Sequence, residues 1–139
     1  DIICGFCGET EEEHQDTVSL MEWSAFNFAY MYKYSERPGT AAAKKMPDDV
    51  PEEVKSRRLS EIVALQQKLS KAFTLTGLNK VHRVLIEGTS KKSKEMLYGR
   101  NSENSVVVFP KENYKPGQYV NVLATDCTVA TLIGKVVNE

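Results

Sequence analysis

The second part of the chain constrains the fold most, because its apolar residues recur at every second position. Five short segments show this alternation, and they are separated by Gly88, Gly99, Pro116-Gly117 and Asp126: residues 81–87, 94–99, 105–109, 119–124 and 129–137. Alternation of this kind predicts β-strands with one buried face. Five such strands within about sixty residues predict a small antiparallel barrel, since closure removes exposed sheet edges.

The first part begins with a strand and a helix. Residues 2–7 (IICGFC) form an apolar run that stops at Gly8, which predicts a short buried strand and a turn. Thr10 followed by Glu13 is a capping box, so a helix should start directly after Thr10. We expect the inward face of this helix to hold Val18, Met21, Leu20 and Trp23. Strand, turn and helix together form a βα unit.

A second strand and a long helix complete the first part. Phe26–Tyr34 (FNFAYMYKY) has aromatic and apolar residues at every second position, which predicts a buried strand. Asp49 is the expected cap of the long helix, with Pro51 and Glu52 in its first turn. This helix should end near Gly77. Its apolar stripe consists of Val54, Leu59, Ile62, Leu65, Leu69 and Phe73. The predicted class is therefore α+β, divided into residues 1–76 and 77–139.

Positive charge is concentrated in the predicted barrel. Residues 1–76 hold 9 Lys and Arg against 13 Asp and Glu, whereas residues 77–139 hold 9 against 6. Cations in strand-joining turns can neutralise phosphates of a nucleic acid, and exposed aromatic rings can stack unpaired bases. The candidate RNA-binding residues are Lys80, Arg83, Ser90, Lys91, Lys92, Lys94, Arg100 and Asn104, with Tyr98, Phe109, Tyr114 or Tyr119 for stacking. The same composition also fits a structural domain without an RNA role.

The three cysteines give a weaker signal. Cys4 and Cys7 have CxxC spacing, and Cys127 stands alone. A redox motif should open a helix and a zinc site needs further ligands, so we interpret all three as free thiols and expect no metal site. A stand-alone thiol or metal-binding protein built on Cys4 and Cys7 remains an alternative. No apolar run is long enough to span a bilayer, and we expect a cytoplasmic location.

A ligand site could lie where the first two strands end. Gly5, Gly8 and Glu9 follow the first strand, and glycines there let backbone amides approach a bound molecule. Arg37 follows the second strand and would add a cation. A simple tight turn and a surface ion-pair partner explain the same residues equally well.

Four strings in order identify a family resemblance. DIICGFCGETEEEHQDT, YSERPGTAAA, DDVPEEVKSRRL and VLIEGTSKKSKEMLYGRNSEN resemble the carboxyl-terminal half of the radical-SAM methylthiotransferases. The similarity is greatest to the branch that adds a methylthio group to carbon 2 of isopentenylated adenosine next to the tRNA anticodon. A branch that modifies an aspartate of a ribosomal protein is the alternative. The chain starts without Met, so we expect it to be a fragment.

The resemblance implies a division of roles. Residues 1–76 would be the last βα units of a partial (β/α) radical-SAM barrel and its connecting helix, with Gly5, Gly8, Glu9 and Arg37 on the S-adenosylmethionine side. Residues 77–139 would be a TRAM domain that binds the tRNA anticodon stem-loop. The family's two [4Fe–4S] clusters need cysteine motifs, including CxxxCxxC, that do not occur here. We therefore expect no catalytic residue and no bound cofactor in this fragment, and a dimer could form through surface exposed by truncation.

Overall fold

The computed structural model describes residues 1–138. The chain forms two compact units, Asp1–Leu69 and a second one that starts at Ser70. Helix α3 (Glu52–Leu75) contributes residues to both. Within the described residues, no helix is long and apolar enough to cross a membrane.

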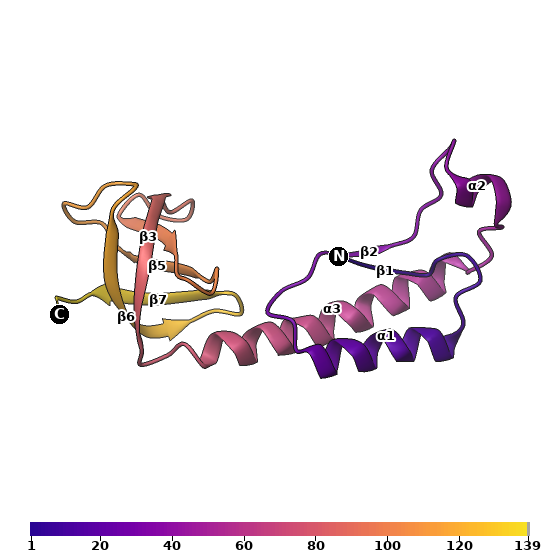
Figure 1. The fold of residues 1–139 in the computed structure, drawn as a ribbon, viewed down its shortest axis with the longest axis horizontal. Coiled ribbons are helices and arrows are strands. Elements are labelled where there is room, and N and C mark those ends of the chain that lie inside the picture. Colours follow the sequence, from indigo (N-terminus) through magenta and orange to yellow (C-terminus); the bar gives the residue numbers. More distant parts are fainter. Residues whose placement is uncertain (139) are drawn as a thin grey trace. The chain divides into compact units, whose positions relative to one another are not determined.

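Unit 1 begins with the predicted βα unit. Strand β1 (Ile2–Cys4), helix α1 (Glu11–Ser24) and strand β2 (Met31–Lys33) follow one another, and β1 pairs with β2 in parallel (Figure 1). The capping box is confirmed, because the Thr10 hydroxyl accepts a hydrogen bond from the Glu13 amide at 3.2 Å. The Glu13 carboxylate in turn accepts one from the Thr10 amide at 2.8 Å. These bonds satisfy two amides that the helix itself leaves unpaired.

Helix α3 starts differently from the prediction. The helix begins at Glu52, and the carbonyl of Pro51 accepts hydrogen bonds from the Val54 and Lys55 amides. The Asp49 carboxylate accepts a hydrogen bond from the Gly8 amide at 2.7 Å. Asp49 therefore ties the loop before α3 to the β1–α1 turn. A short helix, α2 (Ala41–Lys45), lies in the preceding segment.

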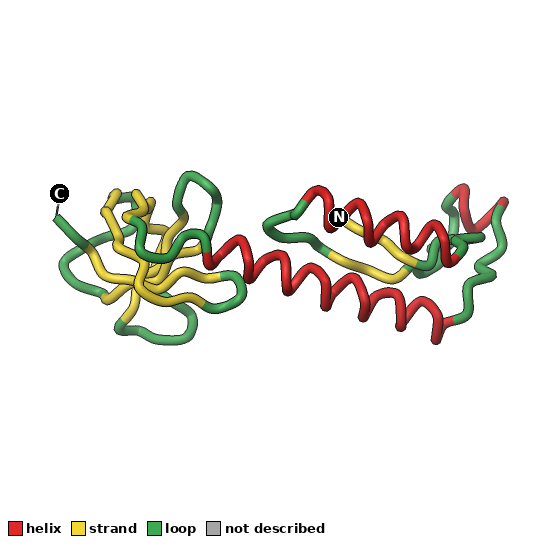
Figure 2. The backbone as a smooth tube through the Cα atoms, turned by 90° about the horizontal axis from the view of Figure 1, so that it is seen from below, coloured by secondary structure: helices red, strands yellow, loops and turns green. Residues whose placement is uncertain are grey.

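The core of unit 1 lies between β1–β2 and the two long helices, which run side by side (Figure 2). Its buried apolar members are Cys4, Met21 and Ile62, with Ile2, Val18, Met31, Leu59, Leu65 and Leu69 packed around them. Two predictions for α1 were wrong: Leu20 is 56% exposed and Trp23 is 85% exposed. The buried stripe follows His14, Val18 and Met21 at helical spacing, which places Leu20 and Trp23 on the opposite side.

The second strand is shorter and more exposed than predicted. Only Met31–Lys33 pair with β1. Phe28, Tyr30 and Tyr32 are more than half exposed. A two-stranded sheet packs on the helices with one face only, so Tyr32 and its neighbour Ile3 on β1 point away from the core. The prediction of a buried strand over Phe26–Tyr34 was therefore wrong.

Unit 2 is a closed five-stranded barrel. Its strands are β3 (Val81–Thr89), β4 (Met96–Arg100), β5 (Val106–Pro110), β6 (Tyr119–Cys127) and β7 (Thr131–Val136), in the spatial order β3-β4-β5-β7-β6. The closed five-stranded barrel was predicted correctly. The prediction that all its strands are antiparallel was wrong, because β5 and β7 run parallel. A closed ring with an odd number of strands cannot alternate direction at every neighbour. One parallel pair is therefore unavoidable.

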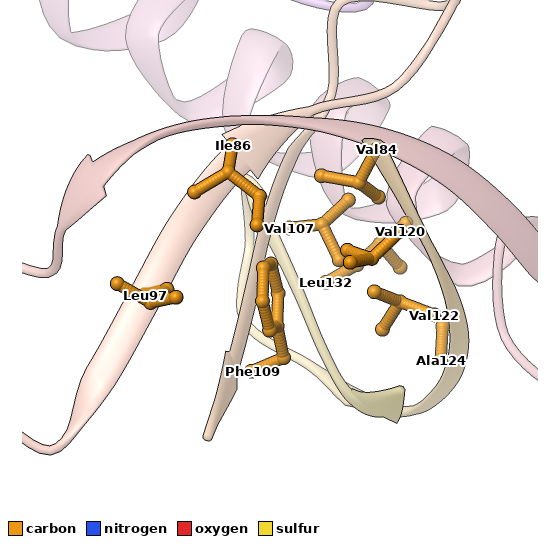
Figure 3. Packing of buried hydrophobic residues seen from close by; sticks show 9 residues of the cluster. All are labelled: Val84, Ile86, Leu97, Val107, Phe109, Val120, Val122, Ala124 and Leu132. Atoms are coloured by element: carbon orange, nitrogen blue, oxygen red, sulfur yellow. The ribbon is translucent and has the colours of Figure 1, made fainter. Parts of the chain in front are cut away.

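The barrel interior is filled by side chains from all five strands, which point toward one another in Figure 3. The core consists of Val84, Ile86, Leu97, Val107, Phe109, Val120, Val122, Ala124 and Leu132. Phe109 is fully buried at its centre, so the prediction that it could stack an RNA base was wrong. Tyr114 is partly buried and packs against the same core.

Candidate nucleic-acid interface

The strand register brings separate sequence motifs onto one outer face of the barrel. Leu85 on β3 pairs with Tyr119 on β6 and with Arg100 on β4. Arg100 pairs with Val106 on β5, which pairs with Thr131 on β7. Neighbouring strands lie about 4.8 Å apart. The Tyr119 and Arg100 backbones are thus about two strand spacings apart, although 19 residues separate them in sequence.

A groove of about 450 Å³ lies on this face, which we call the barrel groove. One side is formed by the β3–β4 turn, with Ser90, Lys91, Lys92 and Ser93. Apolar and aromatic side chains form the rest of the surface: Met96, Tyr98, Val106, Val108 and Ile133. Glu87 and Arg100 also line it, with Thr128 and Thr131. Three of the predicted cations, Lys91, Lys92 and Arg100, therefore converge on one concave surface.

Arg100 is held in position by two neighbours. Its Nε lies 3.3 Å from the Glu87 carboxylate. Its Nη1 donates to the backbone carbonyl and side-chain oxygen of Asn104, at 3.1 and 3.2 Å. Asn104 adopts a left-handed conformation with φ of 63° in the β4–β5 turn. Asn104 thus orients Arg100, whose side chain is still 42% exposed.

The remaining predicted residues lie outside the barrel groove. Arg83 stacks on the ring of Tyr119, with 4.5 Å between the guanidinium carbon and the ring centroid. Tyr119 is 57% exposed, so its ring is open to solvent. Lys80 is exposed just before β3, and Lys94 is in the β3–β4 turn without lining the groove. Arg83 and Tyr119 form a second cationic and aromatic surface. It adjoins Leu85, which pairs with both Tyr119 and Arg100.

One hydrogen-bond network that shapes this face was not predicted from the sequence. Asn101, which is largely buried, donates to His82 Nδ1 at 3.1 Å, and His82 Nε2 lies 2.8 Å from the Gly77 carbonyl. The Asn101 side-chain oxygen accepts from the amides of Glu103 and Ser105. Asn101 thereby holds the β4–β5 turn that carries Asn104. A lone Asn in a polar turn is too common to predict this role.

In unit 1 the predicted cofactor residues are engaged with the protein itself. The amides of Gly5 and Gly8 donate to the carboxylates of Glu9 and Asp49, at 2.9 and 2.7 Å. Glu9 also accepts from Arg58 at 2.7 Å. A Cβ at Gly5 would lie 2.5 Å from Lys55 Cγ. The Lys55 side chain therefore leaves no room for a larger residue at this position. These three residues are therefore held in place by hydrogen bonds within unit 1.

Arg37 lies in a different place. It lines a hollow of about 650 Å³ with Ile3, Tyr32, Lys33, Tyr34, Ser35, Thr40 and Ala42. Gly8 and Glu9 line another hollow, of about 440 Å³, on the α1 side. Arg37 thus lines one hollow, Gly8 and Glu9 line the other, and Gly5 lines neither.

The thiols and acidic groups of unit 1 do not form a recognisable reactive centre. The Cys4 and Cys7 sulfurs face different backbone carbonyls, those of Lys55 and Met46. Burial raises the pKa of the Cys4 thiol, which disfavours the reactive thiolate. Among residues 1–138, the one group with metal-ligand geometry is Glu11, His14 and Glu61. Both of its carboxylates already bind Arg57, at 2.6 Å each.

Hydrogen bonds lower the pKa of both acids in this group. The Arg57 hydrogen bond lowers the pKa of Glu11 to about 2. His14, 2.6 Å from Glu61, lowers the pKa of that carboxyl, and Arg57 adds to the effect. Both carboxylates are therefore ionised at neutral pH and compensated by Arg57. We assign the group to the packing of α1 on α3.

Comparisons with known proteins point to one family. Residues 77–137 match the TRAM domain. Over 137 residues the chain is 58% identical to the tRNA-2-methylthio-N(6)-dimethylallyladenosine synthase of Flavobacterium johnsoniae, covering 99% of this chain and 28% of the relative. The synthase of the same name from Amoebophilus asiaticus is 56% identical over 98% of this chain and 28% of its own length. The chain thus spans less than a third of these relatives.

Proposed function

We propose that this chain, whose residues 77–137 are a TRAM domain, is part of a tRNA methylthiotransferase. Its barrel would bind the tRNA. The longer protein would add a methylthio group to carbon 2 of isopentenylated adenosine beside the anticodon. The docked partner would be the anticodon stem-loop, in the cytoplasm. The names of the two relatives give tRNA and the modified nucleoside, 2-methylthio-N(6)-dimethylallyladenosine.

The observation that carries the proposal is the convergence of Lys91, Lys92 and Arg100 on the barrel groove. Lys91 and Lys92 can each neutralise one phosphate and release its counterion, which favours binding at low salt. Arg100 pairs with Glu87 but is still 42% exposed, so its guanidinium adds to the positive charge of the surface. Arg83 and Tyr119 extend the surface along the strand row. Lys80, Lys94, Ser90 and Asn104 are then peripheral or supporting residues of the same interface.

Unit 1 has a different proposed role. Its β1–α1–β2 arrangement supports the assignment of residues 1–76 to the end of a (β/α) barrel, with residues 77–139 as the docking domain. S-Adenosylmethionine and the two [4Fe–4S] clusters would supply the radical chemistry in the longer protein. The proposed residues on the S-adenosylmethionine side are Gly5, Gly8, Glu9 and Arg37. Ile3, Phe28, Tyr30 and Tyr32 expose apolar surface that missing strands or a second copy would cover.

The docking role predicts a salt-dependent interaction that three cations control. We expect the triple variant Lys91→Ala, Lys92→Ala, Arg100→Ala to bind an anticodon stem-loop RNA about tenfold or more weakly. The slope of log Kd against log salt should fall by about 2 to 3, because each lost phosphate contact removes roughly one unit. Fluorescence anisotropy of a labelled hairpin between about 50 and 200 mM salt measures both quantities.

A charge-matched control separates docking from general attraction. Lys111, Lys115 and Lys135 also belong to unit 2 but do not line the barrel groove. Replacing these three by Ala removes the same charge and should change the salt slope much less. Equal losses of affinity and of salt slope in the two triple variants would contradict the docking role. Absence of hairpin binding at low salt would also contradict it.

A further inference from the structure

We infer that the barrel groove holds the base of one unpaired RNA nucleotide, with the adjoining phosphate at the Lys91 and Lys92 rim. This inference rests on the proposed docking function and adds the form of RNA that is bound. An RNA duplex presents phosphates, 2′-hydroxyls and the edges of its bases, but not the flat faces of the bases, because these are stacked inside. An unpaired base exposes its flat faces and can enter a groove.

The floor of the groove is the first argument. Val106 and Val108 on β5 and Ile133 on β7 point outward, yet each is partly buried. Tyr98 and Met96 on β4 continue this apolar surface. Outward positions elsewhere on the barrel are mixed, with polar Arg83 and Asn121 and with apolar Val81 and Leu123. Phosphate binding alone gives no reason for an apolar floor, whereas a base gains from contact with one.

The charges around the floor favour one orientation of the nucleotide. Glu87 lies within the groove and is 3.3 Å from Arg100. Its carboxylate repels a phosphate from the floor, and Arg100 compensates that carboxylate. Lys91 and Lys92 are in the turn at the rim, where exposed ammonium groups are free to meet a phosphate. A neutral base on the floor avoids repulsion by Glu87, and its phosphate at the turn can bind Lys91 and Lys92.

The size of the groove agrees with this ligand. About 450 Å³ lies within the usual range for small-molecule sites, about 300–1,000 Å³. The aromatic ring of Tyr98 adds a flat surface against which a base can stack. The groove therefore combines shape, an aromatic wall and a cationic rim.

Abasic RNA tests the inference with the 139-residue chain. Hairpins with one loop nucleotide at a time replaced by an abasic residue keep every phosphate and remove one base. We expect replacement at one loop position to weaken binding about tenfold, and replacement at the other positions to change Kd much less. The double variant Val108→Ala, Ile133→Ala should lose a similar factor on the intact hairpin. On the hairpin whose abasic position weakens binding of the parent, the double variant should lose little further affinity. The slope of log Kd against log salt should be the same for the double variant and the parent.

The control variant carries two similar apolar-to-Ala substitutions elsewhere on the barrel. Val81 and Leu123 also point outward, are paired across β3 and β6, and do not line the groove. Val81→Ala with Leu123→Ala should bind all hairpins as the parent does, and circular dichroism checks that each variant is folded. Equal affinity of every abasic hairpin, with salt dependence retained, overturns the base site and leaves docking intact. Absence of any hairpin binding at low salt overturns both.

Discussion

Gly99→Ala is expected to destabilise the barrel by about 3 kcal/mol or more. A Cβ at Gly99 would lie 2.1 Å from the Leu85 carbonyl oxygen and 2.7 Å from Val84 Cγ1. The carbonyl belongs to the backbone of the neighbouring strand β3, so it cannot move without disturbing the pairing of β3 with β4. Urea denaturation of the 139-residue chain, followed by circular dichroism, measures the loss.

Gly88→Ala is the matched control, because Gly88 lies on β3 next to the same strand pair. A Cβ there would meet Tyr98 Cε1 at 3.4 Å, which is an ordinary contact distance. The stability of this variant should stay within about 1 kcal/mol of the parent. If both variants lost the same stability, close strand packing at Gly99 would not be the cause.

Arg58→Met is expected to destabilise unit 1 by about 3 kcal/mol or more. The Arg58 side chain is 5% exposed and pairs with Glu9, which is 13% exposed, at 2.7 Å. Arg58 Nη1 also donates to the Glu9 carbonyl at 3.0 Å. Removal of the guanidinium leaves a buried carboxylate without its cation. The loss of helix signal at 222 nm in urea reports this, because α1 and most of α3 belong to unit 1.

The neighbouring residue supplies the control. Arg57 makes two ion pairs, with Glu11 and Glu61, but its side chain is 45% exposed. Solvent screens such pairs, so Arg57→Met should cost about 1 kcal/mol or less. In addition, Glu9→Gln should be less harmful in the Arg58→Met background than in the parent. Equal costs for the two arginine variants would refute the importance of burial at Arg58.

Local patterns predicted much of this molecule. Alternating apolar residues located the five barrel strands, and the Thr10–Glu13 box located the start of α1. These signals act over a few residues, so they need no knowledge of the rest of the fold. The exposure of Trp23 and Tyr32 could not be predicted this way, because it depends on which face the other elements cover.

Residue patterns alone were enough to predict the existence and type of most elements, the class of the second unit and the cations available for docking. The tertiary structure decided strand order, the parallel β5–β7 pair and the burial of Phe109. It also decided that Lys91 and Ile133, 42 residues apart, line one groove. The reason is physical: periodicity is set by neighbouring residues, whereas a groove on a barrel is set by the register between distant strands.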